Sequence, residues 1–184
     1  MFTVKVTDEI FHHCQNQVDT HNFGRRSFGN GTKEQQLTGI IGQSVVMEMF
    51  GQGYVDGSTG FDGGKDISVL GYSIDVKTMG RKSKVYPSYA NNFMAVQKSL
   101  NTDIFIFCSL NKTNNELTVC GWIPKAEFLM KATLYKKGSI RHRSDGTTFQ
   151  LFADMYEISN KELYDVDSPE MLITQIENWC RSKK

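Results

Sequence analysis

The chain has 184 residues, of which 39% are apolar, and its formal net charge is +1. A chain of this length can bury one solid hydrophobic core, so we expect a single domain spanning residues 1–184. No stretch approaches the roughly 20 continuous apolar residues of a membrane-spanning helix. The first residues also lack the basic and apolar runs of a secretory signal. These features predict a soluble, cytoplasmic protein with no membrane partner.

The cysteine and histidine patterns argue against a metal-binding cysteine framework. The four cysteines are scattered along the chain without a CxxC pair, which is typical of reduced, buried thiols. His12 and His13 are adjacent and diverge on a helix, and no second pair of ligands follows them. The glycine-rich run before Lys65 does not match the phosphate-binding loop pattern. We therefore expect neither zinc nor an organic cofactor.

Two helices are predicted in the first 50 residues. Thr7 is a candidate N-cap for a first helix with apolar residues at helical spacing. Thr32, with a glutamine three residues later, has the form of a capping box and opens a second helix at residues 33–50. Gly39 and Gly42 in this second helix are predicted to let a neighbouring backbone approach closely.

A predicted β-hairpin carries the strongest functional pattern in the chain. Residues 67–70 and 74–78 both alternate apolar and polar side chains, so Asp75 and Lys77 point to one face. A two-residue loop at the intervening glycine places Asp66 on that same face. A three-residue loop would separate the charges, so the cluster depends on the parity of the turn.

The rest of the chain is predicted to add strands and helices to one mixed sheet. The core of the domain is expected at about residues 33–123, and a C-terminal extension at 124–184. This order predicts one α/β domain in which helices flank the sheet. The expected elements are a short helix at 91–99, strands at 104–108 and 117–123, a helix from 124 to about 132, a strand at 149–158, and a final helix that Ser168 caps.

An acid at a strand entry, followed on the next strand by Asp75-Val76-Lys77, resembles the PD-(D/E)xK nuclease superfamily. The resemblance covers about residues 33–108, with Lys65 in place of the family's proline, and implies a restriction endonuclease-like fold. It also implies that Asp66 and Asp75 hold Mg²⁺, for which Mn²⁺ would substitute, and that Lys77 assists the attacking water. The implied activity is metal-dependent endonucleolytic cleavage of DNA.

The sequence departs from the family pattern on the second helix. Many family members carry a Gly-x-x-Gly-Glu sequence, whereas this chain has glutamine at Gln43. We expect Gln43 at the site, where it offers an amide oxygen but no charge. Glu48 is a lesser candidate for a metal ligand, since it lies about 140° around the helix from Gln43. The missing acid supports a second hypothesis, a weak or inactive nuclease-fold module that binds nucleic acid.

Basic residues flank the predicted site. Arg81, Lys82 and Lys84 follow the lysine strand directly, within reach of a phosphate backbone. Further candidates for nucleic-acid contact are Arg25, Arg26, Arg141, His142 and Arg143.

One further interpretation applies to each of three features, namely Gln97, the oligomeric state and the charge pattern. Gln97 is interpreted as a polar residue on a helix surface. Cleavage of both DNA strands often uses two sites, so a homodimer is one expected assembly. An unrelated α/β protein with accidental charges is the third, weaker hypothesis.

Overall fold

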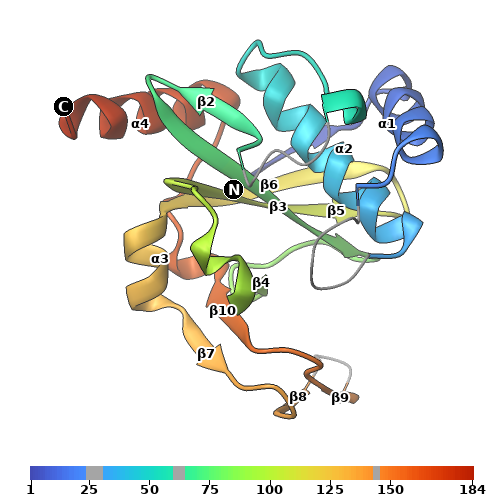
Figure 1. The fold of residues 1–184 in the computed structure, drawn as a ribbon, viewed down its shortest axis with the longest axis vertical. Helices are drawn as coiled ribbons and strands as arrows, with labels where there is room; N and C mark the ends of the chain where they lie inside the picture. The colour runs from blue at the N-terminus through green and yellow to red at the C-terminus, as the bar shows by residue number, and fades with distance from the viewer. Residues whose placement is uncertain (24–30, 60–64, 143–145) are drawn as a thin grey trace.

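The computed structural model describes residues 1–23, 31–59, 65–142 and 146–184 of the chain. At its centre is a curled, mixed five-stranded sheet with the order β1-β6-β5-β3-β2 (Figure 1). β3 and β5 run parallel, and the other neighbouring strands run antiparallel. The fold is thus mixed α/β, as expected. The strands are β1 (Phe2–Lys5), β2 (Ile67–Val69), β3 (Tyr72–Arg81), β5 (Ile104–Asn111) and β6 (Glu116–Pro124).

The two predicted N-terminal helices are confirmed as α1 (Asp8–Thr20) and α2 (Lys33–Met49). The Thr7 hydroxyl accepts a hydrogen bond from the third backbone N–H of α1. Thr32 and the Gln35 side chain form the reciprocal bonds of a capping box at the start of α2. Short polar side chains at these positions satisfy N–H groups that have no partner inside the helix. A single 3₁₀ turn, η1 (Gly57–Thr59), follows α2.

Only one of the two predicted glycine contacts on α2 occurs. A Cβ atom on Gly42 would lie 1.9 Å from Thr78 Oγ1, so this glycine does allow α2 to lie close against β3. A Cβ atom on Gly39 would meet nothing within 4 Å. The prediction was therefore wrong for Gly39, which lies about 60° around the helix from Gly42 and faces open space instead of β3.

The two faces of the central sheet are packed by different elements. On one face, apolar residues of β3 and β5 join those of α1, α2 and α4 (Pro169–Ser182) in a single cluster. On the other face, Phe105 and Phe107 pack with Phe93, Phe128 and Ile158. Figure 1 shows α1 and α2 on one side of the sheet and β4 and β10 on the other. Both sides of β5 are buried, as expected for its continuous apolar run.

The predicted helix at residues 91–99 was wrong. The segment forms a strand, β4 (Ala90–Met94), followed by a 3₁₀ helix, η2 (Ala95–Ser99). Asn91 and Phe93 are buried and point to one side, which is the period-two pattern of a strand. β4 pairs with β10 (Met155–Ser159), so a distant segment of the chain determines its conformation.

The C-terminal extension is more divided than predicted. The single strand expected at residues 149–158 is two strands, β9 (Thr148–Gln150) and β10, because β10 pairs with β4 whereas β9 belongs to a separate two-stranded sheet. Asp154 between them accepts hydrogen bonds from the Lys137 N–H and the Lys136 ammonium. Ser168 caps α4 as predicted. The remaining elements are α3 (Lys125–Lys131), β7 (Thr133–Tyr135), β8 (Ile140–His142) and η3 (Asn160–Glu162).

Two further findings concern the cysteines and the length and polarity of the helices. All four cysteines are buried and none forms a disulfide, as expected. In the part of the chain that the structure describes, no helix combines the length and the apolar character that crossing a membrane requires.

Candidate active site

The turn of the hairpin has the parity that the predicted cluster requires. β2 and β3 pair through Val69 with Tyr72 and Ile67 with Ile74, so the loop consists of two residues, Leu70 and Gly71. Both loop residues have positive φ, at 51° and 91°. This is the backbone geometry of the tight turn that best matches the twist of two antiparallel strands.

Asp66 lies directly beside the Asp75-Val76-Lys77 segment of the neighbouring strand. Its backbone N–H donates to the Ile74 carbonyl at 2.9 Å, and its carboxylate Oδ2 accepts the Val76 N–H at 2.7 Å. The carboxylate thereby takes the place of a backbone partner where β2 begins. Because Val76 stands between the other two charged residues, this bond brings the first acid to the segment that carries them.

Asp75 and Lys77 form an ion pair on the face of β3 that points away from α2. The Lys77 ammonium lies 2.6 Å from Asp75 Oδ2, and the two side chains are only 18% and 4% exposed. The ammonium also lies 5.7 Å from the centre of the Phe93 ring on β4. A charge that is so largely removed from water needs an opposite charge nearby. Each of these two side chains supplies that charge for the other.

Phe93 is a contact that the sequence did not suggest. The alternation of buried residues in β4 is the signal that would have identified the contact with Phe93. The sequence pattern instead predicted a short helix at residues 91–99. The Phe93 ring lies against the Lys77 ammonium and limits the positions that the lysine side chain can take.

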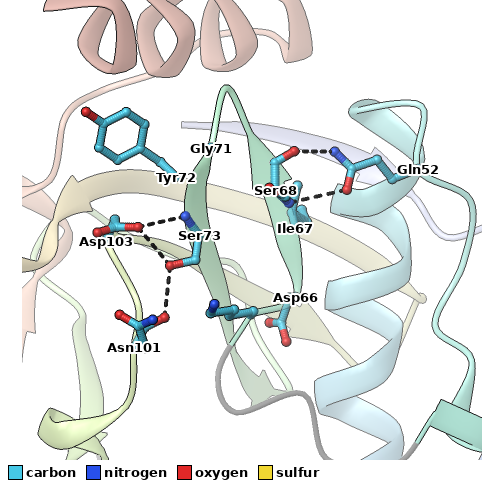
Figure 2. A pocket seen from close by; sticks show the side chains of 10 residues that line it. Gln52, Asp66, Ile67, Ser68, Gly71, Tyr72, Ser73, Asn101 and Asp103 are labelled. Atoms are coloured by element: carbon cyan, nitrogen blue, oxygen red, sulfur yellow. Dashed lines mark hydrogen bonds between the residues drawn. The ribbon is translucent and has the colours of Figure 1, made fainter. Parts of the chain in front are cut away.

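A polar pocket of about 320 Å³ opens beside Asp66 (Figure 2). Ser73, which points to the same face of β3 as Asp75, contributes to its wall. The Ser73 N–H donates to Asp103 Oδ2 at 2.8 Å, and its hydroxyl lies 2.9 Å from that oxygen and from the Asn101 carbonyl. The pocket therefore adjoins the acidic end of the cluster and has fixed hydrogen-bonding walls.

The outer edge of β2 forms another side of this pocket. The Gln52 side chain donates to the Ser68 carbonyl at 2.8 Å, and its oxygen accepts the Ser68 N–H at 3.4 Å (Figure 2). One amide side chain thus satisfies both outward-facing backbone groups of a short edge strand. Such a cover prevents the edge from pairing with another strand.

The two helix candidates for the site lie on α2, which packs against the opposite face of β3. Gln43 is half-buried and follows Gly42, the residue in contact with Thr78. Glu48 is exposed and accepts a hydrogen bond from the Tyr54 hydroxyl at 3.1 Å. Glu48 and burial together raise the pKa of Tyr54, with burial the larger cause. The part that either residue plays at the site remains a prediction.

The three basic residues at the end of β3 and just beyond it have different surroundings. Arg81 is half-buried: its guanidinium donates to the Ala90 carbonyl at 2.8 Å and lies 4.8 Å from the centre of the Tyr89 ring. Burial lowers the pKa of Arg81. Lys82 and Lys84 are exposed. Arg81 therefore makes contacts within the fold, and the two lysines present their charge to solvent.

The other sequence candidates are spread over the molecule. Arg141 lies 3.8 Å from the Tyr135 ring centre and forms an ion pair with Glu157, and that carboxylate raises the pKa of Arg141. Gln97 is 5% exposed, so its interpretation as a surface residue was wrong: it is the buried residue of the short 3₁₀ helix η2. Three predicted contacts, Arg25, Arg26 and Arg143, lie outside the described residues.

Asp66 and Asp75 supply two carboxylates, a donor set that suits Mg²⁺. This ion is usually held by one or two carboxylates, with waters and substrate phosphates completing its shell. Among the described residues, no group of three or more histidine, cysteine or acidic side chains is arranged to hold a metal. A Mg²⁺ ion at this site would therefore depend on waters and a phosphate for its remaining ligands.

Comparisons with known proteins add no relative: no protein-family model, no curated protein and no solved structure matches this chain. The arguments for a function therefore come from the site itself.

Proposed function

We propose that this protein is a metal-dependent endonuclease that hydrolyses DNA phosphodiester bonds, on a fold of the restriction endonuclease type. The observation that carries the proposal is the hydrogen bond from the Val76 N–H to the Asp66 carboxylate, at 2.7 Å. It joins one acid to a strand segment that bears a second acid and a lysine. Carboxylate and ammonium groups converging in this way are the residue types that phosphodiester hydrolysis uses.

Each side chain has a role in this proposal. Asp66 and Asp75 would hold Mg²⁺, which when bound supplies positive charge for the transition state and lowers the pKa of a bound water. Lys77 would hold the attacking water and offset the negative charge that develops on the phosphate. The water oxygen bonds to phosphorus, one P–O ester bond breaks, and the leaving oxygen takes up a proton.

The position of the site within the fold supports these roles. Phe93 limits the movement of the Lys77 ammonium, and Asp75 holds it at 2.6 Å. The pocket is lined by Asp66, the first acid of the cluster. A preorganised charge in a partly dry site stabilises a transition state better than the same charge in water does.

A plasmid-cleavage assay tests the proposal. Supercoiled DNA is incubated with Mg²⁺ or Mn²⁺ and with wild type, Asp66→Asn, Asp75→Asn or Lys77→Met. Each change removes one charge with little change of shape, so we expect cleavage to fall about a hundredfold or more. Asp154→Asn is the matched control, since Asp154 lies between β9 and β10 and pairs with Lys136. Equal cleavage by wild type and Asp75→Asn would refute the assignment.

A second candidate function is a nuclease-fold module that binds nucleic acid without cutting it. Two observations favour it: Gln43 stands where the family has an acid, and the Asp75 side chain is only 4% exposed. It predicts salt-dependent binding without turnover on duplexes, junctions and flaps with either metal. Strong cleavage by Gln43→Glu alone would indicate a degraded site, and robust wild-type turnover would exclude this candidate.

A further inference from the structure

The segment that covers the candidate catalytic face is free of acidic residues. Between Asp75 and Asp103, residues 76–102 contain no aspartate or glutamate, although the whole chain has 20 acidic residues against 21 lysines and arginines. This segment comprises most of β3, a connecting loop, β4 and η2. Its five cations are Lys77, Arg81, Lys82, Lys84 and Lys98. Such local charge attracts a polyanion even though the molecule as a whole is nearly neutral.

The connecting loop, residues 82–89, presents an aromatic ring among these cations. Tyr86 is 51% exposed, and Lys82 and Lys84 beside it are exposed as well. The buried Val85 between them anchors the loop to the aromatic cluster that contains Phe93. Exposed aromatic rings beside lysines are the combination that proteins use to bind single-stranded nucleic acid, in which bases stack on the rings and cations contact the phosphates.

Hydrogen bonds from one segment of the C-terminal extension hold this loop in place. The Asn160 side chain donates to the Tyr86 carbonyl at 3.0 Å, and the Asn160 N–H donates to the Tyr89 carbonyl at 2.9 Å. The Lys161 N–H bonds to the Pro87 carbonyl at 3.1 Å. Tyr86 to Tyr89 also forms a turn closed by its own 3.0 Å hydrogen bond, with proline at the position that favours such turns.

Asn160 and Arg81 are the residues that fix the position of Tyr86. Asn160 is 6% exposed, and its side-chain oxygen accepts a hydrogen bond from Asn91 of β4 at 2.7 Å. Arg81 secures the other end of the loop through Ala90 and Tyr89. A loop fixed in this way loses little entropy when a ligand binds, which favours affinity.

We propose that residues 82–89 bind an unpaired stretch of nucleic acid, with a base stacked on Tyr86 and phosphates on Lys82 and Lys84. The proposal rests on the proposed nuclease function, and it specifies the substrate as one with single-stranded nucleotides near the scissile bond. An aromatic ring can stack on a base only when that base has left the duplex. The end of β3 lies four residues beyond Lys77, or about 13 Å along the strand, so both sites can contact one bound strand.

The test measures binding in EDTA, where no cleavage interferes. Fluorescence anisotropy compares a labelled single strand of about 20 nucleotides with the same sequence as a duplex. The proteins are wild type, Tyr86→Ala and Tyr86→Phe. We expect Tyr86→Ala to weaken single-strand binding about tenfold, to change duplex binding less than twofold, and Tyr86→Phe to retain affinity. Phe152→Ala is the control, because Phe152 is an exposed ring (71%) outside the loop.

Lys84→Ala separates charge from stacking. We expect it to weaken binding to both nucleic acids and to make the salt dependence of single-strand binding less steep by about 0.7 in logarithmic slope. The proposal is overturned if Tyr86→Ala leaves single-strand affinity unchanged, or if it lowers single-strand and duplex affinity equally. Cleavage is not measured in this test. A loss of single-strand binding in Tyr86→Ala would therefore support the loop proposal even if wild type never cuts DNA. Cleavage by wild type would not support the loop proposal if Tyr86→Ala binds as wild type does.

Discussion

The two faces of β3 differ in what they pack against and in what they are able to do. On one face, Ile74 and Val76 are buried with α1, α2 and α4 in a continuous apolar cluster. On the other, the intervening positions carry Asp75 and Lys77, an ion pair set against Phe93. A strand that alternates sides thus contributes to a hydrophobic core and to a polar site within five residues.

The apolar face contributes most to the stability of the fold, whereas the polar face carries the residues of the proposed function. Apolar burial stabilises the fold in proportion to the area removed from water. The ion pair gains little or no net stability, because removing two charges from water costs about as much as their attraction returns. Its retention on a buried face favours a functional explanation. The two faces should therefore respond differently to substitution.

The largest effect is expected where the helix layer meets the apolar face. Gly42→Ala would place a Cβ atom 1.9 Å from Thr78 Oγ1, so α2 must move away from β3. We expect a loss of about 3 kcal/mol in the free energy of unfolding, measured by urea denaturation. Gly39→Ala, three residues earlier with open space, is the control and should stabilise the helix by about 0.5–1 kcal/mol. Equal effects at both positions would contradict the packing described.

The next effect tests the polar face. Asp75→Ala or Lys77→Ala alone leaves a largely buried charge without its partner. The cost is about 2 kcal/mol, below that of a fully buried pair, because Lys77 is still 18% exposed. The double variant should lose clearly less than the sum of the two single losses. Urea denaturation of all four proteins measures this coupling. If the losses simply add, the two side chains do not act as a pair.

The pH dependence of stability tests how far the face of the sheet that carries the candidate site is shielded from water. Burial raises the pKa of the Cys120 thiol to about 12 from an ordinary value of 9.0. Between these values the folded protein binds the proton more tightly than the unfolded chain does, so stability falls as the pH rises. Cys120 contributes a slope of about 1.4 kcal/mol per pH unit in that window.

Cys120→Ala provides the comparison for this measurement. Urea midpoints between pH 8 and 10.5 (about the accessible part of that window) should fall less steeply for the variant than for wild type, while both behave alike below pH 8. The other buried thiols are common to both proteins, so the difference in slope reports Cys120 alone. Identical slopes would mean that this side of the sheet is open to water.

The smallest effect concerns the turn that aligns the two charged strands. Leu70 has a φ of 51°, which a leucine adopts at a cost, and its side chain is 42% exposed. Leu70→Asn should therefore stabilise the protein by about 1 kcal/mol and leave the register unchanged. A rise of a few degrees in melting temperature is the expected readout. A fall would show that the leucine supports the hairpin in another way.

The sequence predicted the elements whose signals are local. Thr7, Thr32 and Ser168 cap helices because their hydroxyls bond to nearby N–H groups, and the alternation around Asp75 reflects the geometry of a single strand. The sequence left two loop lengths open for the turn, and the structure has the two-residue form that places the charges together. These signals need no knowledge of distant contacts.

The parts that the sequence did not predict depend on distant contacts. β4 is a strand because β10 pairs with it, and the polar segment around Asn91 gives little sign of this. Gln97 is buried in the 3₁₀ helix that follows β4, and Arg81 donates to the carbonyl of Ala90, nine residues further along the chain. The side of the sheet that α2 covers is likewise a property of the assembled fold.

A crystal structure of the protein soaked with Mn²⁺ tests the central claim most directly. The anomalous signal of manganese identifies the ion without any assumption about the site. We predict a peak bound by the carboxylates of Asp66 and Asp75, with Lys77 moved away from the Asp75 oxygen that it now contacts at 2.6 Å. An absence of manganese between these carboxylates at a concentration that saturates binding in solution, or an ion held elsewhere, would contradict the account.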